Sequence, residues 1–328
     1  MGQGVMSINA AFARIRASSG AYHAGPSLSL RELPLLKLNA APKKGLIPHF
    51  PVGRSIPRIL HQTHSHRNLP PEIIRSMAEL RLLNPGWTHN FYDDGDRIAF
   101  IRNEYGLEVL NYYLRIEKVY GAARADLFRY LALYRLGGVY LDVKSAASRS
   151  FDDVLRPDDS FLLSQWPRGD GSMFVGWGDH AELKHIPGGE FQQWFIAAVP
   201  GHPFLKAVIE NVLGNIDRYI PGIHRTGAHA VFRVTGPIAY TLAIAPLLEL
   251  APHRMVDSEV DLGLSYSIYS HIAPQAHKLI FSAHYAELTT SLIKVPAWKK
   301  VVFAIYRAIA KPYKAMLRYA RGRRELSG

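Results

Sequence analysis

The sequence predicts an α/β fold in which helices flank a central sheet. Short apolar runs rich in β-branched residues alternate with longer segments whose apolar residues recur at helical spacing. A hydrophobic content of 48% in 328 residues is also enough to bury a sizeable core. We expect three parts: an N-terminal lead-in over residues 1–54, a folded body over 55–293 and a basic amphipathic C-terminal helix over 294–328.

The body begins with a strand, a helix and a second strand. Residues 56–63 (IPRILHQT) predict a buried strand that carries polar side chains to its C-terminal end. A helix opens at Pro70-Pro71-Glu72, since proline is tolerated in a first turn, and ends before Asn84-Pro85-Gly86. Residues 88–92 predict the second strand.

The middle of the chain has the strongest helical pattern. Helices are expected at about 96–104 and 107–117, and residues 121–136 form a third with a continuous apolar face. Gly137-Gly138 ends this helix, because glycine accepts the left-handed backbone of a C-cap. Residues 139–144 (VYLDVK) predict the strand that follows.

Two further helical regions are predicted, over 190–218 with an interruption at residues 200–203, and over 240–250. In the last 30 residues, apolar side chains recur at helical spacing among lysines and arginines. This pattern fits either an anionic membrane surface or a helix docked on the body, and the sequence leaves both open.

Charge and composition narrow the class of protein. The net charge of +12 sits on the ends, because residues 1–60 hold eight Lys or Arg against one acidic residue and residues 294–328 hold ten against one. The body is mildly acidic, so no specific nucleic-acid partner is expected. Absence of cysteine excludes disulfides and thiolate metal sites. With no compact secretory signal and no run of 18 apolar residues, we expect a cytoplasmic protein, peripheral on the inner membrane face.

Two pairs of charged residues bracket the double glycine. Asp126 and Arg129 are three residues apart on the predicted helix, so both reach one ligand, and Asp142 and Lys144 are two apart on the predicted strand, so they share one side of it. Taken singly, each is more simply a surface ion pair or a turn residue. Together they suit transfer of a sugar from a nucleoside diphosphate, which requires groups for the sugar hydroxyls and for the departing diphosphate.

The residues around these pairs resemble a known family. Residues 123–130 (ARADLFRY) followed by 133–142 (LYRLGGVYLD) closely resemble the DXD sugar-binding region of glycosyltransferase family 32. Residues 56–62 resemble the family's first strand, 84–87 its asparagine-proline turn, and 197–204 and 235–237 its later blocks, so that roughly residues 56–290 are covered.

The resemblance implies a GT-A type fold with a mostly parallel sheet. It also implies retaining transfer of a hexose from a UDP- or GDP-sugar to a polysaccharide, lipopolysaccharide or lipid-linked acceptor. The implied catalytic residues are Asp142, Lys144 and Arg129. The implied donor-binding residues are His61, Gln62, Thr63, Arg124, Asp126, Arg129, Gly138, Tyr140 and Asp142.

This chain departs from the family pattern at two places. Lys144 replaces the aspartate that usually binds Mn²⁺ or Mg²⁺. Either the lysine takes the place of the metal, or Asp142 holds a metal with residues elsewhere, His284 first, or the protein is a non-catalytic sugar-nucleotide-binding scaffold. The second departure is Thr63-His64, where members commonly place a base-stacking tryptophan, which leaves the base preference open.

Glu190, after Gly188-Gly189, and His202 lie in the acceptor-side half of the chain. For both, a structural role is the simpler interpretation.

Overall fold

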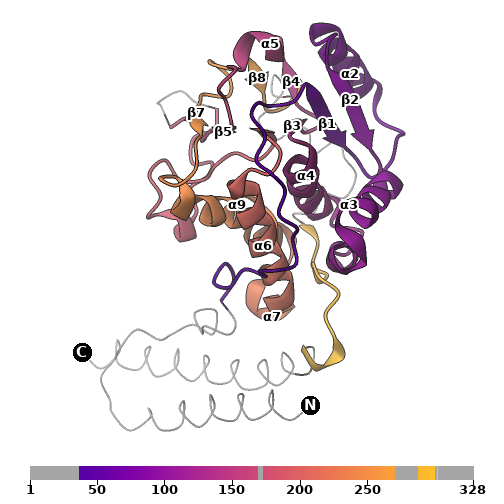
Figure 1. The fold of residues 1–328 in the computed structure, drawn as a ribbon. Coiled ribbons are helices and arrows are strands. Elements are labelled where there is room, and N and C mark those ends of the chain that lie inside the picture. Colours follow the sequence, from indigo (N-terminus) through magenta and orange to yellow (C-terminus); the bar gives the residue numbers. More distant parts are fainter. Residues whose placement is uncertain (1–36, 169–172, 270–286, 300, 302–328) are drawn as a thin grey trace, which may run out of the picture.

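A computed structural model describes residues 37–168, 173–269, 287–299 and 301, and its centre is a six-stranded sheet in the order β2-β1-β3-β6-β5-β7 (Figure 1). β1 pairs in parallel with β2 and β3, and β5 with β7, whereas β6 is antiparallel to both of its neighbours. The strands are β1 Ile59–Thr63, β2 Thr88–Tyr92, β3 Gly138–Leu141, β5 Phe161–Leu163, β6 Phe195–Ala198 and β7 Arg254–Met255. Five of them share one direction, as expected for a mostly parallel sheet flanked by helices.

A second, two-stranded sheet joins β4 to β8. Its strands are Ala146–Ala147 and Leu264–Ser265. The α-helices are α2 Pro71–Leu83, α3 Asp94–Arg115, α4 Gly121–Leu136, α5 Phe151–Val154, α6 Pro203–Arg218, α7 Pro221–His224, α8 Gly227–Val234 and α9 Pro237–Ile244, and the short 3₁₀ helices are η3 Ala181–Leu183 and η4 Ala245–Leu247.

Alternate residues of the central strands enter two different cores, because successive side chains of a strand point to opposite faces. Tyr140, Ile196 and Phe161 face the larger core, which α3, α4 and α6 complete. Val139 and Phe195 face the smaller core, which includes residues of α2 and α5. Figure 1 shows α4 beside α6 on the larger-core side, so α4 is buried along nearly its whole length.

The double glycine connects α4 directly to β3. Both residues have positive φ, 65° at Gly137 and 96° at Gly138. A Cβ at Gly138 would lie 2.4 Å from the carbonyl oxygen of Ile59 on the neighbouring strand. Glycine is therefore required here for two reasons, the backbone conformation and the close approach of β1.

The predicted helix over 121–136 and the strand over 88–92 are confirmed residue for residue. The two helices expected near 96–104 and 107–117 form α3, which is interrupted at Gly106 with φ of 80°. The predicted strand over 139–144 ends at Leu141, so Asp142 and Lys144 lie in the turn that follows.

The helix predicted over 190–218 is wrong in its first half. Residues 195–198 form β6, and α6 begins only at Pro203. A short apolar run fits both a helix and a buried strand, and here pairing with β3 and β5 decides for the strand.

The described parts of the two ends pack on the body. In the lead-in, the Asn39 backbone N–H donates to Asn215 Oδ1 at 2.7 Å and the Gly53 N–H donates to the Pro200 carbonyl at 2.9 Å. Near the other end, Leu292 and Ile293 are fully buried and the Lys294 N–H donates to the Arg115 carbonyl. Of the predicted basic helix over 294–328, all but residues 294–299 and 301 lies outside the described residues.

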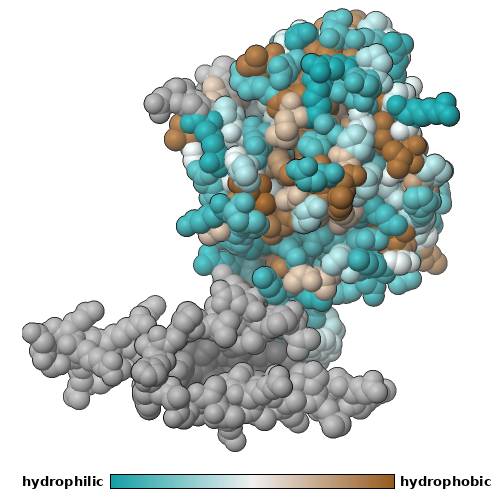
Figure 2. Space-filling view, turned by 60° about the vertical axis from the view of Figure 1, so that its left-hand side comes forward, coloured by the Kyte–Doolittle hydropathy of each residue, from teal (hydrophilic) through white to brown (hydrophobic). Residues whose placement is uncertain are grey.

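Within the described ranges, one segment has the length and hydropathy of a membrane span. It is Gly227–Leu247, and 61% of its most apolar window is buried. Since α8 and α9 lie within this segment and supply residues to the larger core, packing inside the body accounts for its apolarity. On the face shown in Figure 2, hydrophobic side chains lie among hydrophilic ones, as on most folded proteins.

Candidate active site

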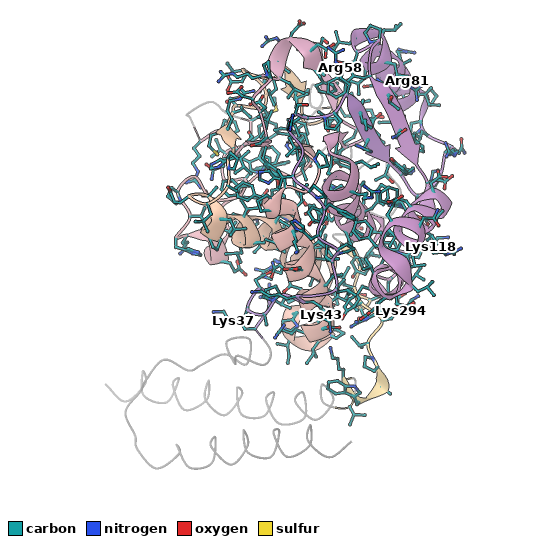
Figure 3. The ribbon with its side chains drawn as sticks, in the orientation of Figure 1. Lys37, Lys43, Arg58, Arg81, Lys118 and Lys294 are labelled. Atoms are coloured by element: carbon teal, nitrogen blue, oxygen red, sulfur yellow. The ribbon has the colours of Figure 1, made fainter. Side chains whose placement is uncertain are left out.

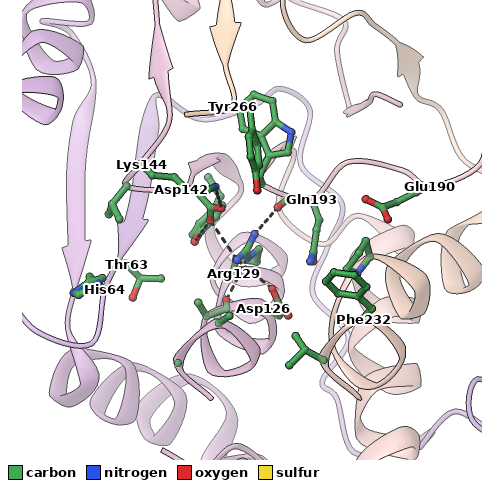
Figure 4. Close-up of a pocket in the computed structure, with 18 of the residues that line it drawn as sticks. Thr63, His64, Asp126, Arg129, Asp142, Lys144, Glu190, Gln193, Phe232 and Tyr266 are labelled. Carbon is green, nitrogen blue, oxygen red and sulfur yellow. Dashed lines mark hydrogen bonds and ion pairs between the residues drawn. The ribbon is translucent and has the colours of Figure 1, made fainter. Parts of the chain in front are cut away.

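A pocket of about 610 Å³ opens where β1 and β3 end and α4 begins. In α/β sheets, this end of parallel strands is where ligands bind. Its lining includes six of the residues predicted to bind the donor or to act in catalysis. These are Thr63, Asp126, Arg129, Tyr140, Asp142 and Lys144 (Figure 4).

Helix α4 supplies the floor of the pocket. Asp126 and Arg129, one helical turn apart, form an ion pair with 3.1 Å between Asp126 Oδ1 and Arg129 Nη2, and each side chain is about 5% exposed or less. Thr235 donates its hydroxyl to Asp126 Oδ2 at 2.9 Å. Both carboxylate oxygens of Asp126 are therefore engaged inside the protein.

Arg129 is held in place by several neighbours. Besides Asp126, its Nη2 lies 3.3 Å from Asp142 Oδ1, and its Nη1 donates to the Gln193 carbonyl at 2.6 Å. Its guanidinium carbon lies 4.5 Å from the centre of the Tyr140 ring, a cation–π contact. The planar guanidinium is thus held in one orientation between two carboxylates.

Asp142 and Lys144 meet in the turn after β3. Lys144 Nζ donates to Asp142 Oδ2 at 2.8 Å, and the Tyr140 hydroxyl donates to Oδ1 at 3.0 Å. The Ser145 N–H donates to the Asp142 carbonyl, which closes the turn, and the Asp142 N–H donates to the Trp194 carbonyl of β6's leading segment. The predicted proximity of the pair is present, but a turn rather than a continuing strand produces it.

The two aspartates differ in their proton affinity. Burial raises the pKa of Asp126 to about 6, and Arg129 opposes this only in part. Burial also acts to raise the pKa of Asp142, but Lys144 and Arg129 outweigh it, so that this pKa lies below its ordinary value. Burial lowers the pKa of the Lys144 ammonium, against the attraction of Asp142. Asp142 is consequently the more firmly ionised carboxylate.

Four predicted donor-binding residues lie outside the pocket lining. Gln62 is buried and Gly138 lies in the tight connection described above. His61 is buried, with Nε2 2.9 Å from the Gly137 carbonyl, and burial lowers its pKa to about 4, so its ring is neutral near pH 7. Arg124 donates hydrogen bonds from Nε and Nη2 to the Ile116 carbonyl. For His61 and Arg124 the structure shows internal hydrogen bonds to backbone carbonyls rather than contacts with the pocket.

The residues around Asp142 do not fit a resident divalent cation. Its Oδ2 already accepts from the Lys144 ammonium and its Oδ1 faces the Arg129 guanidinium, so a metal ion there would meet two positive charges. The part of the chain that the structure describes has no group of three or more His, Asp or Glu arranged to hold a metal ion. His284, the predicted second ligand, lies outside the described residues.

Several lining residues were missed by the sequence reasoning. They include His180, Trp166, Trp177, Trp194, Phe232 and Tyr266. Glu190, placed in the acceptor-side half of the chain with a structural role as the simpler interpretation, also lines the pocket. The clustered tryptophans and glycines of residues 166–194 were the available signal, because aromatic rings beside a few polar groups are typical of ligand pockets.

Part of the chain that forms the pocket matches a known protein family. Residues 70–162, from the start of α2 into β5, match the family described as glycosyltransferase sugar-binding region containing DXD motif. The match covers this segment of the chain only. The matched segment contains Asp126, Arg129, Asp142 and Lys144, so the charged residues of the pocket lie within the region that resembles the family.

Curated proteins similar to this chain include two fission-yeast enzymes. It is 27% identical over 206 residues to inositol phosphoceramide mannosyltransferase 1 of Schizosaccharomyces pombe, covering 61% of this chain and 54% of that protein. It is 25% identical over 214 residues to the initiation-specific alpha-1,6-mannosyltransferase of the same yeast, covering 60% and 50%. The chain thus spans about half the length of these relatives.

Among solved structures, the PaToxG glycosyltransferase aligns with a TM-score of 0.44 and 14% identity, covering 80% of this chain and 86% of that one. The UDP-bound glycosyltransferase domain of the YGT toxin aligns with a TM-score of 0.42 and 10% identity, covering 68% and 83%.

Proposed function

We propose that this protein is a retaining glycosyltransferase of GT-A type that transfers a hexose from a nucleoside-diphosphate sugar to a lipid-linked or glycan acceptor. The observation that carries the proposal is the row of alternating charges at the pocket floor, Asp126, Arg129, Asp142 and Lys144. The names of the relatives support mannose as the hexose and an inositol-containing lipid as one class of acceptor.

Each member of the row has a role that follows from its contacts. Carboxylates accept hydrogen bonds from sugar hydroxyls, and Asp142, with a side chain 22% exposed, presents the more accessible carboxylate. Arg129 holds both aspartates in place. The Lys144 ammonium, 12% exposed and lining the pocket, supplies positive charge for the diphosphate as it leaves.

The contacts of Lys144 support one of the three alternatives that the sequence left open. Because its ammonium already binds Asp142 Oδ2, we favour an enzyme in which this lysine performs the metal's electrostatic function. A flexible point charge is suited to this role, since the ammonium can exchange its contact with Asp142 for one with a phosphate oxygen.

The test is donor turnover with and without metal. UDP- and GDP-hexoses are incubated with the full chain, and hydrolysis and transfer are followed in EDTA, Mg²⁺ and Mn²⁺. We expect turnover in EDTA, reduced about 10²–10³-fold by Lys144→Ala, as for loss of other groups that stabilise transition-state charge. Lys184→Ala, which removes an exposed lysine outside the pocket lining, serves as the matched control.

Other outcomes would revise the proposal. Turnover that requires Mn²⁺ or Mg²⁺ would assign the charge stabilisation to a metal ion. Binding of a donor without hydrolysis or transfer under any condition would support the non-catalytic sugar-nucleotide-binding function instead. Failure to bind any sugar nucleotide would contradict the proposal as a whole.

We also propose that the enzyme works on the cytoplasmic face of a membrane. The basic ends of the chain support this, because clusters of Lys and Arg are attracted to anionic lipid. A lipid-linked acceptor would be reached at the same surface.

A further inference from the structure

At one end of the pocket, a group of aromatic side chains takes no part in the charge row. Trp166, Trp177 and Tyr266 meet pairwise with ring centres 4.9 to 5.4 Å apart and ring edges against faces. All three line the pocket. We call these three residues the aromatic wall. Tyr266 is distant in sequence from the two tryptophans, so the wall forms only when the chain folds.

The aromatic wall adjoins a buried acid. Trp166 donates its indole N–H to Glu190 Oε1 at 2.9 Å, and His180 Nε2 lies 2.7 Å from Glu190 Oε2. Glu190 is 7% exposed and still lines the pocket. A carboxylate oxygen accepts more than one hydrogen bond, so each of these oxygens keeps capacity for a ligand hydroxyl.

Backbone geometry holds this acid against the wall. Gly178, with φ of 77°, lies so close that a Cβ on it would be 2.8 Å from Trp166 Cδ1 and 3.0 Å from Glu190 Cβ. The Glu190 N–H donates to the Gly178 carbonyl at 3.3 Å. The position of the carboxylate is therefore built into the fold.

Trp194 provides an independent observation. Trp194 is 5% exposed and lines the pocket, yet its indole N–H has no hydrogen-bond partner within the described part of the chain. An unpaired buried donor costs stability unless a ligand or water accepts a hydrogen bond from it. Its backbone carbonyl binds the Asp142 N–H, so this donor is tied to the charge row.

The two ends of the pocket are distinct. In Figure 4, Glu190 and Phe232 lie on the opposite side of Arg129 from Thr63 and His64, with the charge row between. Lys144 Nζ lies 4.1 Å from the centre of the Tyr266 ring, so the wall begins where the charge row ends. A transferase needs two ligand subsites that meet at the reacting centre, and this arrangement offers them.

We propose that the aromatic wall, Glu190 and Trp194 form the acceptor subsite, and that it binds a polyhydroxylated six-membered ring, a sugar or a cyclitol. The C–H face of such a ring suits the electron-rich face of an aromatic side chain. Its hydroxyls both donate and accept, which matches the Glu190 carboxylate and the Trp194 N–H. The inference rests on the proposed function only in assigning the other end of the pocket to the donor.

The experiment measures binding of two ring probes by saturation-transfer NMR. Methyl α-D-mannopyranoside and myo-inositol are titrated into the full chain, alone and with saturating UDP or GDP. We expect one probe to bind, Glu190→Gln to weaken it about tenfold or more, and nucleotide affinity to stay within about twofold. Glu182→Gln on η3 removes a nearby acid outside the lining and is expected to leave both affinities unchanged.

A second pair of variants guards against loss of folding. Trp177→Ala is expected to weaken the ring probe and Trp177→Phe to retain most of its affinity, with thermal unfolding recorded for each. Binding of the mannoside alone would indicate a glycan acceptor, and binding of myo-inositol alone a cyclitol headgroup.

Two results would overturn the acceptor subsite: no binding of either ring, or equal loss of ring and nucleotide affinity in Glu190→Gln. Glu190-dependent ring binding by a protein that binds no nucleotide would leave the subsite standing and contradict the proposed function alone.

Discussion

At the scale of single residues, the site depends on charges that are buried together. Asp126 and Arg129 are each 4% exposed or less, and Asp142 and Lys144 complete a row with as many positive as negative groups. Breaking such a buried pair by removing one partner typically costs about 3–5 kcal/mol, because a lone charge stays behind. The groups that bind the donor therefore also affect the stability of the pocket floor.

Asp126 makes the stability of the protein depend on pH. Its pKa of about 6 in the folded protein exceeds the ordinary 3.8, so the folded state holds the proton more tightly. The Asp126 contribution to stability is then fully present below pH 3.8 and is lost as pH rises through about 6. A shift of this size corresponds to about 3 kcal/mol.

We therefore expect the wild type to lose stability relative to Asp126→Asn as pH rises from about 4 to 7, by up to about 3 kcal/mol. Urea unfolding at successive pH values measures this difference. Asp153→Asn, which changes an exposed aspartate on α5, controls for the general effect of removing an acid. A difference that stays constant with pH would contradict the raised pKa.

At the scale of elements, the α4–β3 connection sets the geometry of the site. Arg129 on the helix and Asp142 in the turn after the strand are only 13 residues apart in the chain, and they face each other because Gly137-Gly138 reverses the chain within two residues. This brings Arg129 to within 3.3 Å of Asp142. The spacing between these two residues is thus a property of the connection as much as of the side chains.

Gly138→Ala is expected to lower the free energy of unfolding by about 2 kcal/mol or more. The new Cβ would face both a positive φ and the Ile59 carbonyl at 2.4 Å. Gly86→Ala is the matched control, since nothing lies within 4 Å of its Cβ position and it has no positive φ. Thermal and urea unfolding compare the two, and equal small effects would show that β1 and β3 yield easily.

At the scale of the whole molecule, the excess of basic residues lies at the two ends of the chain, whereas the pocket lies in the body. The described part of the lead-in lies near the described C-terminal segment. Asp217 forms ion pairs with both Lys43 of the lead-in and Arg115 of α3. The Arg115 carbonyl in turn accepts a hydrogen bond from the Lys294 N–H. Figure 3 shows Lys37, Lys43 and Lys294 along this one edge of the body. Cations from both ends of the chain are thereby concentrated at one place.

We expect the full chain to sediment with vesicles containing phosphatidylserine and to be released at high salt, because the attraction is screened within about 10 Å at 0.1 M salt. Replacing four cations of residues 311–321 by glutamine should reduce binding at least tenfold, since each cation near the surface contributes about 1 kcal/mol. The control replaces four exposed body cations. These are Arg75, Arg81, Arg102 and Lys184. Equal loss in both variants would show that net charge alone, and not the C-terminal segment, determines binding.

The sequence by itself determined the helix of α4, its glycine stop and the four charged residues of the pocket floor. These features are local: Asp126 to Lys144 span one helix, one turn and one short strand, so helical spacing and glycine chemistry suffice to bring them together. The α/β class also followed from the sequence, because short apolar runs alternate with segments whose apolar residues recur at helical spacing.

Only the tertiary structure decided which side chains beyond this stretch face the pocket. Strand β6 was predicted as helix because its apolar run has no distinguishing period, and pairing with β3 and β5 settled it. Arg124 and His61 turn inward to backbone carbonyls, whereas Glu190 and Trp194 turn to the pocket. The direction of these side chains depends on neighbours far away in the chain, and no local pattern carries that information.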